Sequence, residues 1–264
     1  MGTIQILGFL GALLTGLVLG LLGGGGAAVS IPILVYAFKL PSSVATGYSL
    51  LIVSVTALFG TIQNIRGQLI RWSALLKCGL PALAATYIMR RYIVHSIPSV
   101  FYSSKNFTLT KDAFILVLLS FFMAFVAKSM IWPAPQRKEE HKPKPYIVIF
   151  LLSVLIGFFT GTVGAGGGFL LIPLILSAEP MEFRNATATS LAVVMLNSFM
   201  GFIGDIQSNI QMDWSFLMIF MGFSVAGVIL GIGIASKINN KKLREIFGYV
   251  MMAIAIYIFI KEVI

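Results

Sequence analysis

The chain has 264 residues, of which 58% are hydrophobic and only 11% are charged. Because soluble domains carry roughly 25% charged residues, this composition excludes a soluble enzyme, a nucleic-acid-binding domain and a disordered protein, and it predicts an all-α protein that crosses a membrane several times. The net charge of +10 lies mostly in loops between apolar runs, where Lys and Arg orient the chain and contact membrane lipid rather than nucleic acid.

Apolar runs follow one another along the chain, and most are long enough to cross a bilayer, which takes about 20 residues. Two runs, 28–38 and 168–178, are short and cover only about half of the ~30 Å hydrocarbon core at ~1.5 Å per residue. The eight long runs are 4–22, 43–64, 72–89, 111–131, 146–163, 184–204, 214–236 and 245–262.

A polar, proline-rich segment at 132–145 interrupts this series. It cannot cross a membrane, and it is rich in Lys and Arg, as cytoplasmic loops are. We therefore predict a first membrane repeat at 1–131, a cytoplasmic linker at 132–145 and a second membrane repeat at 146–264.

The two halves of the chain resemble each other. When 14–65 is compared with 155–206, a shift of 141 residues, 17 of the 52 positions hold the same residue. This similarity indicates an internal duplication. Each half then holds four full helices and one short or broken helix, which gives 8–10 membrane segments.

The charges of equivalent loops favour an inverted repeat. The loop after 184–204 holds Asp205 and Asp213 and is predicted outside, whereas the equivalent loop after 43–64 holds Arg66 and Arg71 and is predicted inside. Inversion requires an odd number of crossings per half, so the short segments must cross. The basic loop from Arg90 to Lys111 falls outside in this arrangement, against the charge rule.

The first candidate site is a glycine cluster in each half, placed shortly before a proline. Glycine lowers helix stability by ~1 kcal/mol relative to Ala, so both clusters should break a helix. Broken backbone at membrane depth is tolerated only inside protein or beside a water-filled cavity. Two helix starts would meet there and bind an anion through their free N–H groups, although close helix packing also uses small residues. The predicted binding glycines are Gly24, Gly25, Gly26, Gly166, Gly167 and Gly168.

The second candidate is a row of small polar residues after each cluster. Steps of three and four residues place each row on one helix face, where hydroxyl and amide groups can replace water around an anion. Hydrogen bonding between helices explains the rows equally well. The predicted binding residues are Thr46, Ser49, Thr187, Ser190 and Asn197.

The sequence offers few residues that could form a metal, cofactor or catalytic site. Cys78 is the one cysteine, and both histidines lie in loops, so we predict no metal, no cofactor and no catalytic residue. Lys77 and Lys128 lie within apolar runs, where we expect them to reach the interface rather than bind substrate. Arg66 either attracts anions at the cytoplasmic mouth or only orients the chain.

The glycine clusters are followed by Ile-Pro at 31–32 and 172–173, and then by an Ala-Thr-x-x-Ser segment at 45–49 and 186–190. In these motifs the chain resembles the TauE/SafE family of sulfite and organosulfonate transporters over nearly its whole length. The resemblance implies a multi-pass permease of a prokaryotic inner membrane that moves small sulfur oxyanions or sulfonates, usually outward. The two half-sites differ, since Thr56 in one half matches Asn197 in the other.

We expect one anion to bind between the two glycine breaks, and the halves to rock so that each side opens in turn. Export of an anion needs no pump, because one charge that leaves a negative interior gains about 2.3 kcal/mol per 100 mV. The alternatives are an anion channel, a permease for a non-sulfur anion and, least favoured, an intramembrane enzyme. The sequence leaves a homo-oligomer open.

Overall fold

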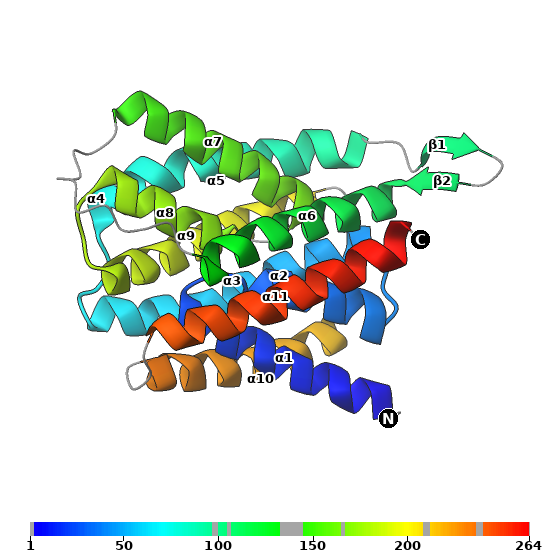
Figure 1. Cartoon of the computed structure of the whole chain (residues 1–264), viewed down its shortest axis with the longest axis horizontal. Coiled ribbons are helices and arrows are strands. Elements are labelled where there is room, and N and C mark those ends of the chain that lie inside the picture. The colour runs from blue at the N-terminus through cyan, green and yellow to red at the C-terminus, as the bar shows by residue number, and fades with distance from the viewer. Residues whose placement is uncertain are drawn as a thin grey trace.

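The computed structural model describes residues 3–96, 100–104, 107–132, 145–164, 167–207, 212–235 and 240–263. These residues form a bundle of helices with the first and last described helix ends at the same end of the bundle (Figure 1). The helical membrane architecture that the sequence predicts is confirmed. A two-stranded antiparallel hairpin, β1 (Val100–Ser104) and β2 (Phe107–Thr110), occupies part of the predicted loop from Arg90 to Lys111.

The helices keep the predicted order. The first half contains α1 (Thr3–Leu22), α2 (Gly26–Pro32), η1 (Ile33–Ala37), α3 (Ser42–Arg66), α4 (Trp72–Ala74), η2 (Leu75–Gly79), α5 (Leu80–Ile88), η3 (Met89–Ile93), η4 (Val94–Ser96) and α6 (Lys111–Ile131). The second half contains α7 (Tyr146–Val163), α8 (Gly168–Ala178), α9 (Phe183–Ile206), α10 (Trp214–Ala235) and α11 (Asn240–Val263). Most of the predicted linker at 132–145 lies outside the described residues.

Five helices of the described chain are long and apolar enough to cross a membrane, namely α3, α7, α9, α10 and the continuous helix Trp72–Ile93 that α4, η2, α5 and η3 form together. This last helix corrects the sequence analysis, which ended the apolar run at residue 89. The backbone stays helical through Arg90, because that side chain is buried against the neighbouring helices rather than left in a loop.

The short helices turn back along the helices that precede them. A Cβ atom built on Gly11 of α1 would lie 2.7 Å from the side chain of Ile33 in η1, and one built on Gly26 would lie 3.1 Å from the side chain of Leu19. The α1 segment and the α2–η1 segment are therefore antiparallel. Together α2 and η1 span Gly26–Ala37, close to the short run predicted at 28–38, and α8 spans the run predicted at 168–178.

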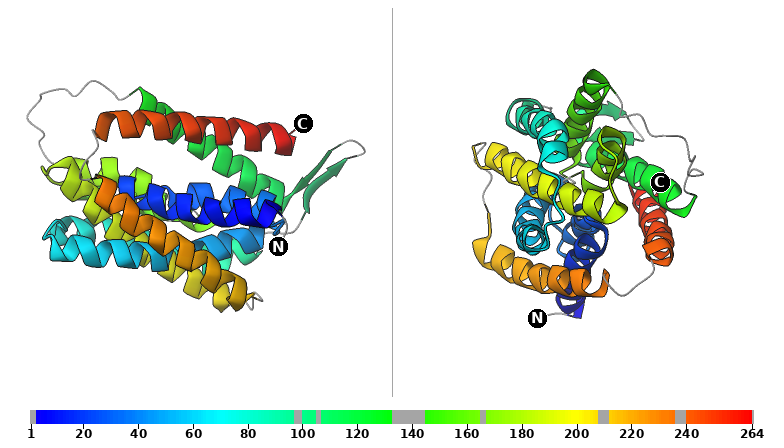
Figure 2. Two further views of the ribbon diagram at one scale, coloured as in Figure 1. Left: turned by 90° about the horizontal axis from the view of Figure 1, so that it is seen from below. Right: turned by 90° about the vertical axis from the view of Figure 1, so that its left-hand side faces the viewer.

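Helices that hold equivalent positions in the two halves cross each other. A Cβ on Gly60 of α3 would lie 2.7 Å from Leu191, and the equivalent Cβ on Gly201 of α9 would lie 3.1 Å from Leu50. These reciprocal contacts make α3 and α9 antiparallel. Figure 2 shows the equivalent pair α6 and α11 side by side and also antiparallel. The arrangement is compatible with an inverted repeat.

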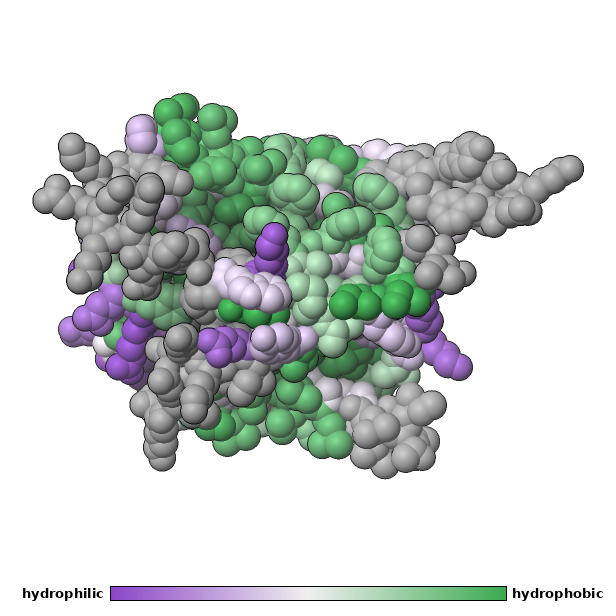
Figure 3. Space-filling view, in the orientation of Figure 1, coloured by the Kyte–Doolittle hydropathy of each residue, from purple (hydrophilic) through white to green (hydrophobic). Residues whose placement is uncertain are grey.

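Apolar residues cover much of the face of the molecule that Figure 3 shows. Phe125 of α6 and Met218 of α10 are each 66% exposed, which is typical of helices that face lipid rather than water. Lys77 turns toward the end of its helix, where its Nζ lies 2.7 Å from Oε1 of Glu179 in the loop after α8. The hydrogen bonds from Lys77 and Ser73 hold the pKa of Glu179 below its ordinary value.

Candidate functional site

The two glycine breaks meet inside the bundle. A Cβ atom built on Gly168 would lie 2.6 Å from the Cα of Gly24 and 3.1 Å from the carbonyl oxygen of Gly23. Gly24 and Gly168 are both buried, so the backbones of the two halves are in direct contact. The structure thus brings together two predicted site glycines that lie far apart in the sequence, whereas the predicted Gly166 lies outside the described residues.

Each short helix begins at a glycine with a left-handed backbone. Gly25 precedes α2 with φ 86°, and Gly167 precedes α8 with φ 66°. Side chains disfavour this conformation, so both breaks depend on glycine. Because both N-cap residues are glycines, no N-cap side chain can bond to the first N–H groups of these helices, and α2 starts at the buried Gly26. The first N–H groups of such helices are the donors that an anion uses.

Thr46 and Thr187 hold equivalent positions and contact the glycine break of the opposite half. A Cβ on Gly164 would lie 2.7 Å from the Cβ of Thr46, and a Cβ on Gly23 would lie 3.0 Å from the carbonyl carbon of Thr187. Each threonine hydroxyl donates to a backbone carbonyl of the preceding turn at 2.9 Å. The two halves are therefore packed together by the same contact made twice.

Ser49 and Ser190 link the long helices to the short ones. The Oγ of Ser49 lies 2.8 Å from the Oγ of Ser30 in α2, and the Oγ of Ser190 donates to the carbonyl oxygen of Gly168 at 2.7 Å. All three serines are fully buried. In this conformation the predicted hydroxyls are engaged within the protein, so an anion would have to take over some of these bonds.

Asn197 differs from the other predicted residues because its side chain has hydrogen-bonding capacity to spare. The residue is 0% exposed, and neither Oδ1 nor Nδ2 has a hydrogen-bond partner among the described residues. An unsatisfied buried polar group costs about 1–3 kcal/mol. Asn197 lies one turn after Val194, whose Cγ2 is 2.6 Å from the Cβ position on Gly168. A donor and an acceptor are thus held one helical turn from the place where the breaks meet.

A buried ion pair lies at the far end of α9, and sequence reasoning missed it. The Nη1 of Arg90 lies 3.4 Å from both carboxylate oxygens of Asp205 and 3.3 Å from the Oγ1 of Thr46. The side chains of Arg90 and Asp205 are 1% and 0% exposed. Arg91 donates to the carbonyl oxygen of Gln207, so two basic residues counted in the predicted outer loop are engaged with α9. The sequence did offer one indication of this pair, because Arg90 and Asp205 each follow directly after an apolar run.

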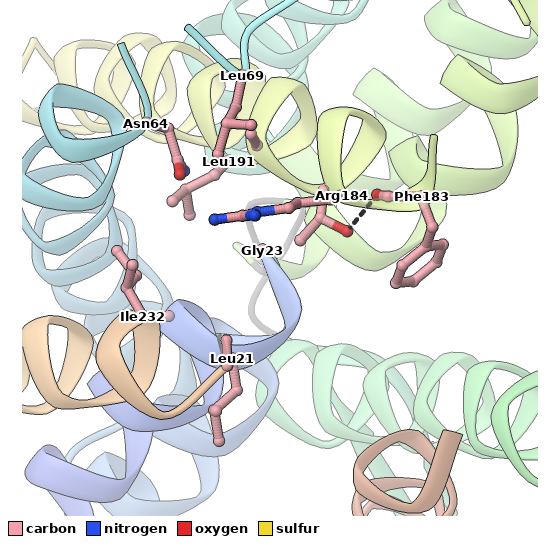
Figure 4. A pocket seen from close by; sticks show the side chains of 12 residues that line it. Leu21, Gly23, Asn64, Leu69, Phe183, Arg184, Leu191 and Ile232 are labelled. Carbon is pink, nitrogen blue, oxygen red and sulfur yellow. Dashed lines mark hydrogen bonds between the residues drawn. The ribbon is translucent and has the colours of Figure 1, made fainter. Parts of the chain in front are cut away.

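A pocket of about 100 Å³ lies at the opposite end of α9. In Figure 4 the guanidinium of Arg184 extends from α9 across this pocket toward Asn64 of α3, close to Gly23. Thr187 lines the same pocket, and its hydroxyl donates to the carbonyl oxygen of Phe183. Of the predicted site residues, Thr187 is therefore the one that this pocket reaches, and Arg184 and Asn64 were not predicted.

Comparison with known proteins covers nearly the whole chain. A family model described as "Sulfite exporter TauE/SafE" matches residues 8–258. The chain is 28% identical to a "Probable membrane transporter protein" of Xylella fastidiosa, over 93% of this chain and 91% of the relative. It is 25% identical to a probable membrane transporter protein of Methanocaldococcus jannaschii, over 93% of each chain. No solved structure matches the chain significantly.

Proposed function

Because the chain belongs to the sulfite exporter TauE/SafE family, we propose that it moves small sulfur-containing anions, such as sulfite, thiosulfate or an organosulfonate, out of the cell. The transporter class is supported by relatives that are named probable membrane transporters and match over more than nine-tenths of their length. The membrane is the inner membrane of a prokaryotic cell in this proposal.

The contact between Gly24 and Gly168 carries the proposal. It brings the starts of α2 and α8 together in the interior, where N–H groups and positive dipole ends favour an anion without any fixed positive charge. Asn197 adds an amide that has no hydrogen-bond partner among the described residues. The anion is held at the helix starts beside this contact, with Asn197, Ser49 and Ser190 completing its shell, while each end of the bundle opens in turn.

The charges of the loops support an orientation. Arg66 ends α3, and the backbone N–H of Arg71 donates to the Oγ1 of Thr189 in α9, so both basic residues lie at the end of the bundle that holds the Arg184 pocket. Lys and Arg favour the cytoplasmic side. The pocket then opens inward, and the ion pair of Arg90 and Asp205 closes the outer end. An anion that moves outward follows the membrane potential, at about 2.3 kcal/mol per charge and 100 mV.

Thermal unfolding of the purified protein with candidate anions tests the proposal. Sulfite, thiosulfate, sulfoacetate, taurine and chloride are compared at matched ionic strength. A ligand at 100 times its Kd stabilises the folded protein by about 2.7 kcal/mol, so one sulfur anion should raise the melting temperature selectively. The same anion should cross liposome membranes that contain the protein.

The matched variant is Asn197→Thr, which places in the second half the residue that the first half has at position 56. Thr56 donates to the carbonyl oxygen of Ile52, so a threonine at 197 should fold with its hydroxyl satisfied and should lose most of the anion response. Selective stabilisation by chloride alone would replace the sulfur transporter with a permease for a non-sulfur anion, and conductance far above carrier turnover would replace it with an anion channel.

A further inference from the structure

The two ends of the α3–α9 crossing are built alike but differ in one charge. Asn64 in α3 and Asp205 in α9 hold equivalent positions, 141 residues apart. At one end Asp205 lies beside a guanidinium and a threonine, Arg90 and Thr46. At the other end Asn64 shares a pocket with Arg184 and Thr187. A carboxylate at one end is therefore matched by a neutral amide at the other.

The glycine breaks are also placed alike at the two ends of the α3–α9 crossing. Gly164 contacts both Arg90 and Thr46 at the closed end, and Gly23 contacts Thr187 in the wall of the pocket. The two arginines come from different helices, since Arg90 lies in the last turn of the Trp72–Ile93 helix and Arg184 lies in the first turn of α9. The repeat thus places a guanidinium beside the same threonine and glycine at both ends, although the sequence alignment does not pair the arginines.

Arg184 has no helix-stabilising reason to be where it is. It lies in the first turn of α9, where the helix dipole disfavours a cation. No ion pair joins it to another described residue. A guanidinium offers a planar fork of donors that fits an oxyanion in a bidentate manner. The pocket of about 100 Å³ exceeds the room that one water needs, so it can hold a small oxyanion.

We propose that this pocket is an oxyanion-binding site at the entrance to the transport path, in which the anion takes the place that the Asp205 carboxylate has at the other end. Arg184 binds two oxygens of the anion, and the amide of Asn64 and the hydroxyl of Thr187 contact the remainder. The site rests on the proposed function for the identity of its anion. It adds a docking step before the anion reaches the glycine breaks, and it makes Arg184 a binding residue.

Three variants test the site. Arg184→Gln removes the guanidinium. Asn64→Asp supplies the carboxylate that the other end has. This carboxylate should pair with the guanidinium of Arg184 inside the pocket and take the place of the anion. Arg66→Gln is the control, because it removes an exposed charge two residues from Asn64 that does not line the pocket. Sulfite, thiosulfate and inorganic phosphate serve as probes in thermal unfolding, and sulfite flux is measured in liposomes.

We expect Arg184→Gln and Asn64→Asp each to weaken oxyanion binding about tenfold or more, as the loss of a charged hydrogen bond does. Arg66→Gln should change the affinity less than twofold. Asn64→Asp should leave the melting temperature without ligand nearly unchanged, because its ion pair with the exposed Arg184 would be partly open to solvent. Equal losses in Arg184→Gln and Arg66→Gln, or unchanged binding in Asn64→Asp, would overturn the site.

Failure of the site and failure of the proposed function give different results. If the wild-type protein carries sulfite and Arg184→Gln carries it equally well, the function stands and the site is wrong. If sulfite and thiosulfate do not bind but phosphate binds in a manner that needs Arg184, the site stands and the sulfur substrate is wrong. If no oxyanion binds in a manner that needs Arg184, the site is wrong whatever the substrate.

Discussion

Gly168 has no room for a side chain, because its Cβ position is 2.6 Å from the Cα of Gly24 and 2.6 Å from Val194. Backbone cannot move aside cheaply, so Gly168→Ala should push the two breaks apart and lower the affinity for the transported anion. We expect a loss of stability of about 1–3 kcal/mol, as for other overpacked interiors. Thermal unfolding and liposome flux measure the two effects.

The control for this substitution is Gly222→Ala in α10, where a Cβ would have nothing within 4 Å. Alanine stabilises a helix interior relative to glycine by about 0.5–1 kcal/mol, so this variant should be slightly more stable and should transport normally. If Gly168→Ala also transports normally, the meeting of the breaks has no part in binding.

Residues that are local in the sequence could be predicted, and residues that depend on distant partners could not. The glycine breaks and the polar rows follow from spacing alone, and the structure places Gly24, Gly168, Ser190 and Thr187 at or near the contact between the halves. Arg90 was predicted in a loop because its partner Asp205 is 115 residues away. Whether an arginine lies inside or outside a bundle depends on the carboxylate that meets it, and no local pattern reveals that carboxylate.

At the scale of helices, the ion pair fastens the end of the Trp72–Ile93 helix to the end of α9. Removing one partner of a buried pair costs about 3–5 kcal/mol, since the other charge stays buried. We expect Asp205→Asn to lower the free energy of unfolding by about that amount. A double variant, Arg90→Met with Asp205→Leu, should recover much of it. Unfolding of the purified protein measures both.

Glu179→Gln is the matched control, because Glu179 and Lys77 form an ion pair that is partly open to solvent. Such pairs contribute little to stability, so the melting temperature should hardly change at neutral pH. Since hydrogen bonds from Lys77 and Ser73 lower the pKa of Glu179, the small contribution of this pair is present above the ordinary pKa of a glutamate and is lost as the pH falls through the lowered value. Equal effects of Asp205→Asn and Glu179→Gln would contradict the distinction.

The helix order was also predictable, because each helix carries its own apolar run and each short helix follows its own glycines. The pairing of the helices was not. It is set by places where glycine lets two backbones touch: a Cβ on Gly20 would lie 2.5 Å from the carbonyl oxygen of Val228, and a Cβ on Gly231 would lie 2.5 Å from that of Leu17. Small residues are spread along many helices of this chain, so the sequence does not show which ones face each other.

For the whole molecule, these contacts predict which parts move together. The Oγ of Ser224 in α10 donates to the carbonyl oxygen of Ala12 in α1 at 3.0 Å. In a chain without Cys78, Ala12→Cys with Ser224→Cys should form a disulfide on oxidation, and sulfite flux in liposomes should continue. The single variants under the same oxidation are the controls. Flux that stops on oxidation and returns on reduction would mean that α1 and α10 separate during transport.

The pairing of α1 with α10, and of α5 with α7, joins one helix from each half of the sequence. A motion that carried one half away from the other would have to pull apart backbones that touch at both pairs. We therefore expect that the two copies in the sequence are not the two moving parts, as the simplest rocking scheme assumes. Each rigid body would then be a hybrid that takes its helices from both copies, and a single copy of the repeat expressed alone would contain neither of them complete.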